Sequence, residues 1–237
     1  MFFFLRCLLL LIACLSTFDI EGLLLRDKLS QAEIGDFVVT AQGKSYTLLQ
    51  ICNRDTKSLT IEEISIPANK VPQNMSWSQW LKQGAPSHTS WLRYVVNLST
   101  GSIDKSFSKS KQGWLEVTQK NETFLPTLMS LQFSAIPISE RRKIGPAPER
   151  GSPDRRRIWQ PKMVFNGHVI PNIEFEGWQA LWPQDGGELA GKVIEIYLPK
   201  ENGCRYPSYF PYWLQVCGSV AKATLRIIDS GTTNPSG

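Results

Sequence analysis

Alternating apolar and polar residues recur along most of the chain. The clearest run is LTIEEISIP, where Leu59, Ile61, Ile64 and Ile66 are apolar and Pro67 ends the run. Similar short runs, separated by turn residues, are DFVVT, SYTLLQIC, SWLRYVVNL, GWLEV, TLMSLQFSAIP, PKMVF, HVIPNIEFEGW, GKVIEIYLP, PYWLQVC and KATLRIID. Short strands spaced in this way predict a mostly β fold, an antiparallel β-sandwich-like domain.

One or two short helices interrupt the strand pattern. In SWSQWLKQG, Ser76 can cap a helix, Trp77, Trp80 and Leu81 fall on one face, and Gly84 can end it. Residues 23–31, LLLRDKLSQ, fit either a second short helix or an extended tether. The helical part of the fold is therefore small.

The amino terminus is an apolar segment that ends on a cysteine. Its first fifteen residues are apolar except for Arg6, and the run is shorter than the roughly 20 residues of a membrane-spanning helix, so a signal peptide fits better. Leu11-Ile12-Ala13-Cys14 resembles the lipobox of bacterial lipoproteins. The resemblance implies removal of residues 1–13 and a lipid on Cys14. The alternative is an ordinary signal in which Cys14 has no special role.

The lipobox resemblance sets the expected organisation of the chain. A lipidated tether would cover residues 14–35 and a β-rich globular domain residues 36–230. Leu15 is not the Asp that marks inner-membrane retention in many such lipoproteins. We therefore expect anchoring at the outer membrane or on the periplasmic face of a bacterial cell envelope.

A basic loop interrupts the domain at residues 138–157. Its sequence from Glu140 to Arg157 holds seven basic and three acidic residues, a large part of the net charge of +5. The Pro and Gly residues within it predict a long surface loop or a boundary between two halves. An exported protein rarely meets nucleic acid, so we expect no nucleic-acid partner; anionic lipid headgroups or an acidic partner fit better.

Three further cysteines follow Cys14. Cys204 and Cys217 flank a turn-rich segment and form the natural disulfide pair in an oxidising compartment, which leaves Cys52 as a small apolar residue in a strand. The chain has only two His and no CxxC pair. We expect no metal site and no cofactor.

Two patterns invite a catalytic interpretation. S-x-x-K occurs at Ser106–Lys109 and Ser108–Lys111, in a segment that resembles a polar loop and lacks the partner motifs of penicillin-binding enzymes. Carboxylates lie close to Trp178 and Trp182 in the sequence, a composition typical of sugar-cleaving sites: Glu174, Glu176, Asp185 and Glu188. An envelope glycan hydrolase is therefore the enzymatic alternative, against carboxylates that only line a solvent face and a turn.

An aromatic run lies between the two paired cysteines. In CRYPSYFPYWLQVC, the rings of Tyr209, Phe210 and Trp213 form a candidate binding surface for a protein or a glycan. The alternative is a structural plug at the end of a sheet.

The whole pattern favours a non-enzymatic binding or assembly module held at an envelope membrane by lipid. Its expected partner, besides the membrane, is an envelope protein or a glycan. The segments FPYWLQV and LRIIDSG are similar to uncharacterised envelope lipoproteins of chlamydiae. N-glycosylation patterns at Asn74, Asn97 and Asn121 support the main rival address, a secreted eukaryotic glycoprotein.

Overall fold

The computed structural model describes residues 22–115, 124–200, 206–217 and 224–233. The strands are β1 (Leu23–Leu24), β2 (Asp36–Gln42), β3 (Ser45–Arg54), β4 (Ser58–Pro67), β5 (Ser90–Asn97), β6 (Ile103–Ser108), β7 (Gly113–Leu115), β8 (Gln132–Ala135), β9 (Met163–Phe165), β10 (His168–Ile170), β11 (Phe175–Leu181), β12 (Val193–Pro199), β13 (Trp213–Cys217) and β14 (Thr224–Thr232). The helices are α2 (Leu25–Leu29), α3 (Trp77–Lys82), α4 (Phe124–Ser130) and the 3-10 turn η1 (Ala68–Lys70).

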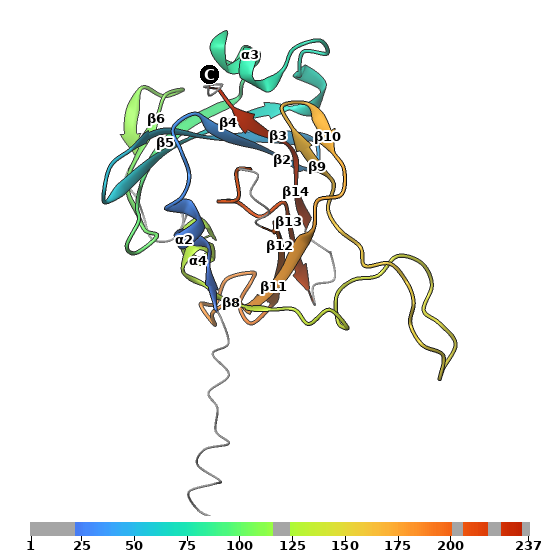
Figure 1. Ribbon diagram of the computed structural model, residues 1–237. Helices are drawn as coiled ribbons and strands as arrows, with labels where there is room; N and C mark the ends of the chain where they lie inside the picture. The colour runs from blue at the N-terminus through green and yellow to red at the C-terminus, as the bar shows by residue number, and fades with distance from the viewer. Residues whose placement is uncertain (1–21, 116–123, 201–205, 218–223, 234–237) are drawn as a thin grey trace, which may run out of the picture.

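Twelve strands form one antiparallel sheet in the order β1-β8-β11-β12-β13-β14-β2-β3-β4-β5-β6-β7. The sheet bends so that β2 to β6 cross the top of the view in Figure 1 while β11 to β14 run down one side. The two parts face each other across a shared core, which confirms a mostly antiparallel, sandwich-like β domain. Because β14 pairs with β2, one continuous sheet spans the chain on both sides of residues 138–157. The strand order thus favours a surface loop over a boundary between halves.

The main core lies inside the bend, where two short helices fill it. Leu25 and Leu29 of α2 and Leu128 and Met129 of α4 are at most 1% exposed and pack with the inner faces of both parts of the sheet. Leu25 and Leu29 form an i, i+4 pair, and in α4 the partly buried Leu125 lies one turn before Leu128 and Met129 on the same face. The folded body therefore includes residues 23–29, which sequence reasoning placed in a tether; burial of Leu25 and Leu29 ties this segment into the core.

A second, smaller core lies on the outer face of β2, β3 and β4, under α3. The helix has the expected N-cap, since Ser76 and Gln79 exchange both bonds of a capping box, and Gly84 follows its end with φ of +77°. Trp80 is 1% exposed, and its Nε1 donates to the Pro86 carbonyl at 3.0 Å. The helix predicted from Ser76 to Gly84 is confirmed.

The small sheet β9–β10 docks on β14 through buried polar groups. The turn Asn166-Gly167 has positive φ at both residues, the geometry of a two-residue hairpin turn. Asp229 Oδ1 accepts from the amides of Gly167 (3.0 Å) and Ser230 (2.9 Å). Ser230 Oγ donates to the Val164 carbonyl at 2.8 Å and lies 2.9 Å from the hydroxyl of Tyr212. We call β9, β10 and these three side chains the docked hairpin.

Two segments differ from the sequence-based expectation. The run TLMSLQFSAIP was expected to be a strand, yet its first part belongs to α4 and only Gln132–Ala135 is extended. The polar segment around Ser106 was expected to be a loop, yet it forms β6, with Ser106 and Ser108 buried. Tertiary contacts decided the local structure in both cases: α4 packs into the main core, and β6 pairs with β5 and β7. Local propensity is only a weak guide against such contacts.

Candidate functional site

The basic loop is an ordered excursion, which we call the basic arm (residues 138–157). Its two limbs are joined at the base: the amide of Ile144 donates to the Arg157 carbonyl at 2.9 Å, and the amide of Trp159 donates to the Arg142 carbonyl at 2.7 Å. Figure 1 shows the arm running outward from the body well beyond the sheet. Its charge is therefore displayed away from the core.

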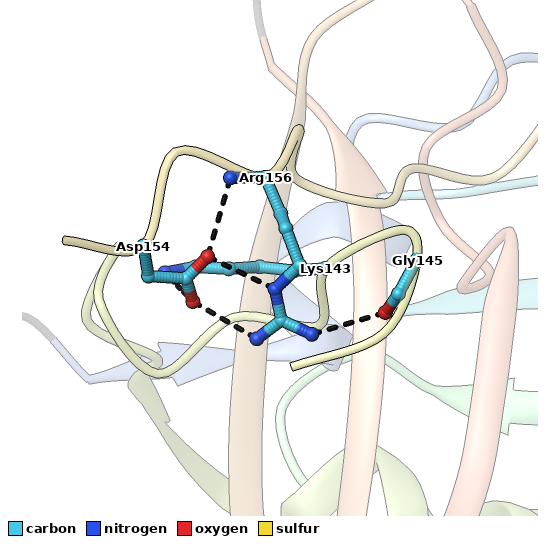
Figure 2. A network of polar contacts seen from close by, with 4 residues as sticks. All are labelled: Lys143, Gly145, Asp154 and Arg156. Carbon is cyan, nitrogen blue, oxygen red and sulfur yellow. Dashed lines mark hydrogen bonds and ion pairs between the residues drawn. The ribbon is translucent and has the colours of Figure 1, made fainter. Parts of the chain in front are cut away.

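Ion pairs and hydrogen bonds around the carboxylate of Asp154 join the two limbs of the arm; we call this contact the staple. Asp154 accepts from Lys143 Nζ (2.8 Å) and from the guanidinium of Arg156 through two bonds of 2.9 Å, while Arg156 also donates to the Gly145 carbonyl at 3.1 Å. Figure 2 shows these four residues joined in a chain of contacts from Lys143 through Asp154 and Arg156 to Gly145. The hydrogen bonds from Arg156, then Lys143, hold the pKa of Asp154 well below its usual range. The carboxylate of Asp154 is thus ionised throughout the physiological pH range.

Aromatic rings and a guanidinium meet where the arm joins the sheet. The rings of Trp159 and Trp213 lie 4.8 Å apart between centroids, and Trp159 lies edge-on to Tyr197 at 5.4 Å. The guanidinium carbon of Arg142 lies 5.1 Å from the Trp159 ring centroid and 5.9 Å from that of Trp213. Cations at this distance over indole rings are attracted by the ring quadrupole. Arg142 therefore holds the base of the arm against the sheet.

The register of the sheet explains why these residues meet. Gly177, Tyr197, Trp213 and Arg226 are direct cross-strand partners in a row over β11, β12, β13 and β14, so they share the outer face. A Cβ at Gly177 would lie 3.4 Å from both Ile136 and Tyr197. Ile136, which precedes the arm, therefore packs directly over Gly177 and beside Tyr197 on this row.

A cleft of about 520 Å³ opens beside the tryptophans, and we call it the aromatic cleft. Its described lining includes two exposed cations, Lys162 and Arg226, and no carboxylate; the lining residues are Trp159, Gln160, Pro161, Lys162, Val164, Tyr212, Trp213, Arg226, Ile227 and Ile228. Indole faces beside cations suit a ligand that combines an anionic group with an apolar or ring-shaped body. Sequence reasoning found only Trp213 of this set. Tyr212 is next to Trp213 in the sequence, but the remaining lining residues come from 159–164 and 226–228, and only the fold brings these segments together.

The candidate aromatic surface divides into buried and accessible rings. Tyr209 is 2% exposed and Phe210 is 5% exposed, and the Tyr209 hydroxyl donates to the Leu49 carbonyl at 3.4 Å. These two rings fill the core between the two parts of the sheet, as the structural-plug alternative expects. Because they are buried there, they cannot contact a partner. Trp213 is partly buried and faces the aromatic cleft. Of the three candidate residues, only Trp213 is placed to touch a ligand.

The cysteine predictions stay open. Cys14 and Cys204 lie outside the described residues, so neither lipidation nor the Cys204–Cys217 pairing is tested. The Cys217 sulfur lies 3.8 Å from Glu195 Oε2, at the carboxyl end of β13. Cys52 lies in β3 with its sulfur 3.5 Å from the Thr60 carbonyl, and burial, followed by the charge of Glu62, raises its thiol pKa to about 11. A thiol held protonated in this way is a poor nucleophile.

Two carboxylates of the hydrolase alternative, Asp185 and Glu174, are engaged in local contacts. Asp185 accepts from Trp182 Nε1 at 3.0 Å and from the Gly187 amide at 2.9 Å, and these bonds, the backbone one first, lower its pKa. Its carboxylate closes its own turn. Glu174 lies before β11, is exposed, and pairs with Lys200 at 3.5 Å. A glycosidase acid needs a raised pKa and a second carboxylate nearby, and Asp185 shows the opposite shift.

The S-x-x-K lysine is engaged elsewhere. Lys109 Nζ lies 2.8 Å from the buried carboxylate of Glu62, which also pairs with Arg93 at 2.6 Å. Burial alone would raise the pKa of Glu62, but the hydrogen bonds from Lys109 and Arg93 outweigh it and lower the pKa. This cluster ties β4, β5 and the end of β6 together on the outer face. It is an ion-paired contact between strands.

Metal and membrane-spanning features are absent from the described part of the chain. Among residues 22–115, 124–200, 206–217 and 224–233, no three His, Cys, Asp or Glu side chains converge as a metal site would require. Within the same ranges, every helix is too short or too polar to cross a bilayer.

Comparison with known proteins gives a family and a fold relative. The model of the CT021 protein family matches residues 47–171, more than half of the chain, including the whole basic arm and Trp159 and Lys162 of the aromatic cleft. The solved structure of the hypothetical protein CT021 from Chlamydia trachomatis is similar with a TM-score of 0.62 and 17% identity, over 91% of this chain and 96% of that chain. At this identity, the likeness shows the fold alone. No curated protein matches the sequence.

These findings confirm the coarser part of the resemblance, a similarity to uncharacterised chlamydial proteins. They do not address lipidation. The segments FPYWLQV and LRIIDSG, which suggested the resemblance, lie outside residues 47–171, so the family match rests on other parts of the sequence. The chain belongs to the CT021 protein family.

Proposed function

We propose that this protein is a lipid-anchored, non-enzymatic binding module of a bacterial cell envelope, and that the aromatic cleft is its ligand site. The observation that carries the proposal is the arrangement of Arg142, Trp159 and Trp213 beside Lys162 and Arg226. Two indole rings and two cations, Lys162 and Arg226, line one opening, and the guanidinium of Arg142 lies over the same indole rings. Such a surface attracts anions and offers them an apolar wall.

The chemistry of the cleft favours an acidic saccharide. Indole rings pack against the C–H faces of sugar rings, and guanidinium and ammonium groups bind carboxylate or phosphate. A volume of about 520 Å³ suits one or two sugar units, within the range of small-molecule sites. An acidic side chain of an envelope protein would offer the charge but not the ring face, so it makes a weaker fit.

The envelope address draws support from the start of the sequence and from the family. Leu11-Ile12-Ala13-Cys14 resembles a lipobox, and the fold relative comes from a bacterium. The thiol of Cys14 would receive the diacylglyceryl group. Cys14→Ala should abolish incorporation of labelled palmitate and release the protein from membranes, and a wild-type protein that takes up no label would rule out this part of the proposal.

Ligand binding tests the cleft itself. Tryptophan fluorescence of the full chain should change on titration with glucuronate or a glucuronate disaccharide, and not with glucose or glucose disaccharides. Lys162→Gln and Arg226→Gln should each weaken acidic-sugar binding by about tenfold, the size of one lost charge-assisted contact. Both side chains are exposed, so thermal stability should be unchanged.

Lys44→Gln is the matched control, because Lys44 is equally exposed and lies in the β2–β3 turn, outside the cleft. It should leave the affinity within twofold of wild type. Equal loss in all three variants would mean that net charge, and not the cleft, attracts the sugar. A fluorescence titration that responds to none of the acidic sugars would contradict the ligand class.

A further inference from the structure

The basic arm leaves the fold beside the amino-terminal end of the described chain. β1 is antiparallel to β8, with Leu23 opposite Phe133 and Leu24 opposite Gln132. In an antiparallel pair, the chain running backward from Leu23 and the chain running forward from Phe133 travel in the same direction. Gly22 and Ser134, the described residues that continue the two strands in these directions, therefore lie at the same end of the β1–β8 pair. Figure 1 shows β8 at the lower end of the view, with the arm running outward from there.

The surface of the arm combines positive charge with exposed apolar side chains. Arg150, Arg155 and Arg157 are exposed, while Ile138 is 67% and Ile144 is 52% exposed. The staple at Asp154 fixes the limbs, so the charges are presented on an ordered surface. Basic side chains interspersed with apolar ones are typical of surfaces that lie at the headgroup level of an anionic bilayer.

We infer that the basic arm is a second membrane contact, one that rests on anionic lipid headgroups. Its orientation draws on the proposed lipid anchor: Cys14 precedes Gly22 by eight residues, which span at most about 29 Å when extended. The edge of the sheet that carries the arm would thus be held close to the bilayer. The two acyl chains of a diacylglyceryl group already attach a protein stably, so the basic arm would serve to orient the domain on the bilayer and would not be needed for retention. The contact of the arm with lipid does not itself require the acyl chains.

Vesicle partitioning tests the arm without the lipid anchor. The full chain carrying Cys14→Ala is mixed with vesicles of phosphatidylcholine alone or with 30% phosphatidylglycerol. The amino-terminal segment carries Arg6 and the α-amino group and therefore adds to the ratio of the two partition coefficients. It is the same in the parent and in every variant, so the change of the ratio on mutation reports the contact of the arm. We expect a ratio of at least ten at 0.05 M salt, falling towards one at 0.5 M, where screening shortens the reach of surface charges to a few ångströms.

The triple variant R150Q/R155Q/R157Q should lower that ratio at least fivefold. The control variant K44Q/K57Q/K105Q removes the same charge from exposed sites away from the arm and should change the ratio less than twofold. Equal effects of the two variants would show that net charge alone drives binding and would overturn the inference. A ratio near one for the parent protein would overturn it as well, and would leave an acidic protein as the partner of the arm.

Protease protection gives an independent measure of the same contact. Trypsin should cut after Arg150 several times more slowly with anionic than with neutral vesicles, while cleavage after Lys57 keeps its rate. Unchanged cleavage after Arg150 would contradict the contact. Acidic-sugar binding by R150Q/R155Q/R157Q should match that of the parent chain, because none of these residues lines the aromatic cleft. Failure of the arm and failure of the cleft are therefore distinguishable.

Discussion

The docked hairpin and the basic arm are neighbouring excursions from the same sheet, yet they are held by opposite kinds of interaction. The hairpin is fixed by buried polar atoms: Asp229 is 6% and Ser230 is 0% exposed, and both bond to its backbone. The arm is fixed by Asp154, a partly exposed carboxylate between two cations at the surface. Buried hydrogen-bonded groups are costly to leave without partners, whereas exposed ion pairs contribute little. The hairpin should therefore govern stability and the arm should be free to serve binding.

The largest effect should come from the core beside the docked hairpin. Phe210 is 5% exposed and lies two residues before Tyr212, whose hydroxyl meets Ser230. Phe210→Ala should cost about 3 to 5 kcal/mol through lost burial and the cavity left behind. Urea unfolding followed by fluorescence measures the loss. A change of less than about 1 kcal/mol would contradict the plug and return Phe210 to the list of surface candidates.

The contrast also shows what the sequence could predict. Alternation in LTIEEISIP and the capping residues around α3 predicted their elements because local patterns there agree with the tertiary contacts. The sequence did not predict β6 because its buried positions are Ser106 and Ser108. The buried face of this strand is therefore polar, and the segment lacks the apolar alternation of a half-buried strand. α4 was missed because Leu125, Leu128 and Met129 fall close to the apolar run that forms β8.

The candidate site was harder to predict than the fold. The basic arm was visible as a composition shift, and Trp213 as part of an aromatic run. Arg142, Trp159 and Arg226 come from three separated segments, and their meeting depends on the register of β12, β13 and β14 and on the two bonds at the base of the arm. No short stretch of sequence shows which residues of β12, β13 and β14 lie opposite one another. Such sites require the long-range strand order, which a single sequence does not show.

The next effect concerns the acceptor that holds the hairpin turn. Asp229→Ala removes the oxygen that accepts from the Gly167 and Ser230 amides, and it should cost about 1 to 3 kcal/mol because buried donors are left unsatisfied. Asp229→Asn keeps an acceptor of the same shape and should cost much less. The two variants are compared by denaturant unfolding. Equal losses would show that charge, and not the acceptor, holds the hairpin.

A pH dependence of stability follows from the same carboxyl. Burial raises the pKa of Asp229 above its usual value, against the lowering effect of the Gly167 and Ser230 amides. A raised acid pKa favours folding below about pH 4, the pKa of an unfolded Asp, and that contribution is lost as pH rises through the folded-state pKa. Relative to wild type, Asp229→Asn should therefore gain stability as pH rises from 3.5 to 6. A flat difference over that range would contradict the raised pKa of Asp229.

The smallest effect on stability should come from the arm, when Asp154 is changed to Asn as Asp229 was above. Asp154→Asn breaks the ion pairs with Lys143 and Arg156, but exposed pairs contribute little, so the midpoint of thermal unfolding should stay within about 1 °C of wild type. The loss should be local: hydrogen exchange at the Ile144 amide should quicken severalfold, because the limbs of the arm are no longer tied. The Gly167 amide in the docked hairpin provides the reference and should exchange at its wild-type rate. Faster exchange at both amides would mean that arm and hairpin open together, and the division between a stabilising excursion and a binding excursion would then fail.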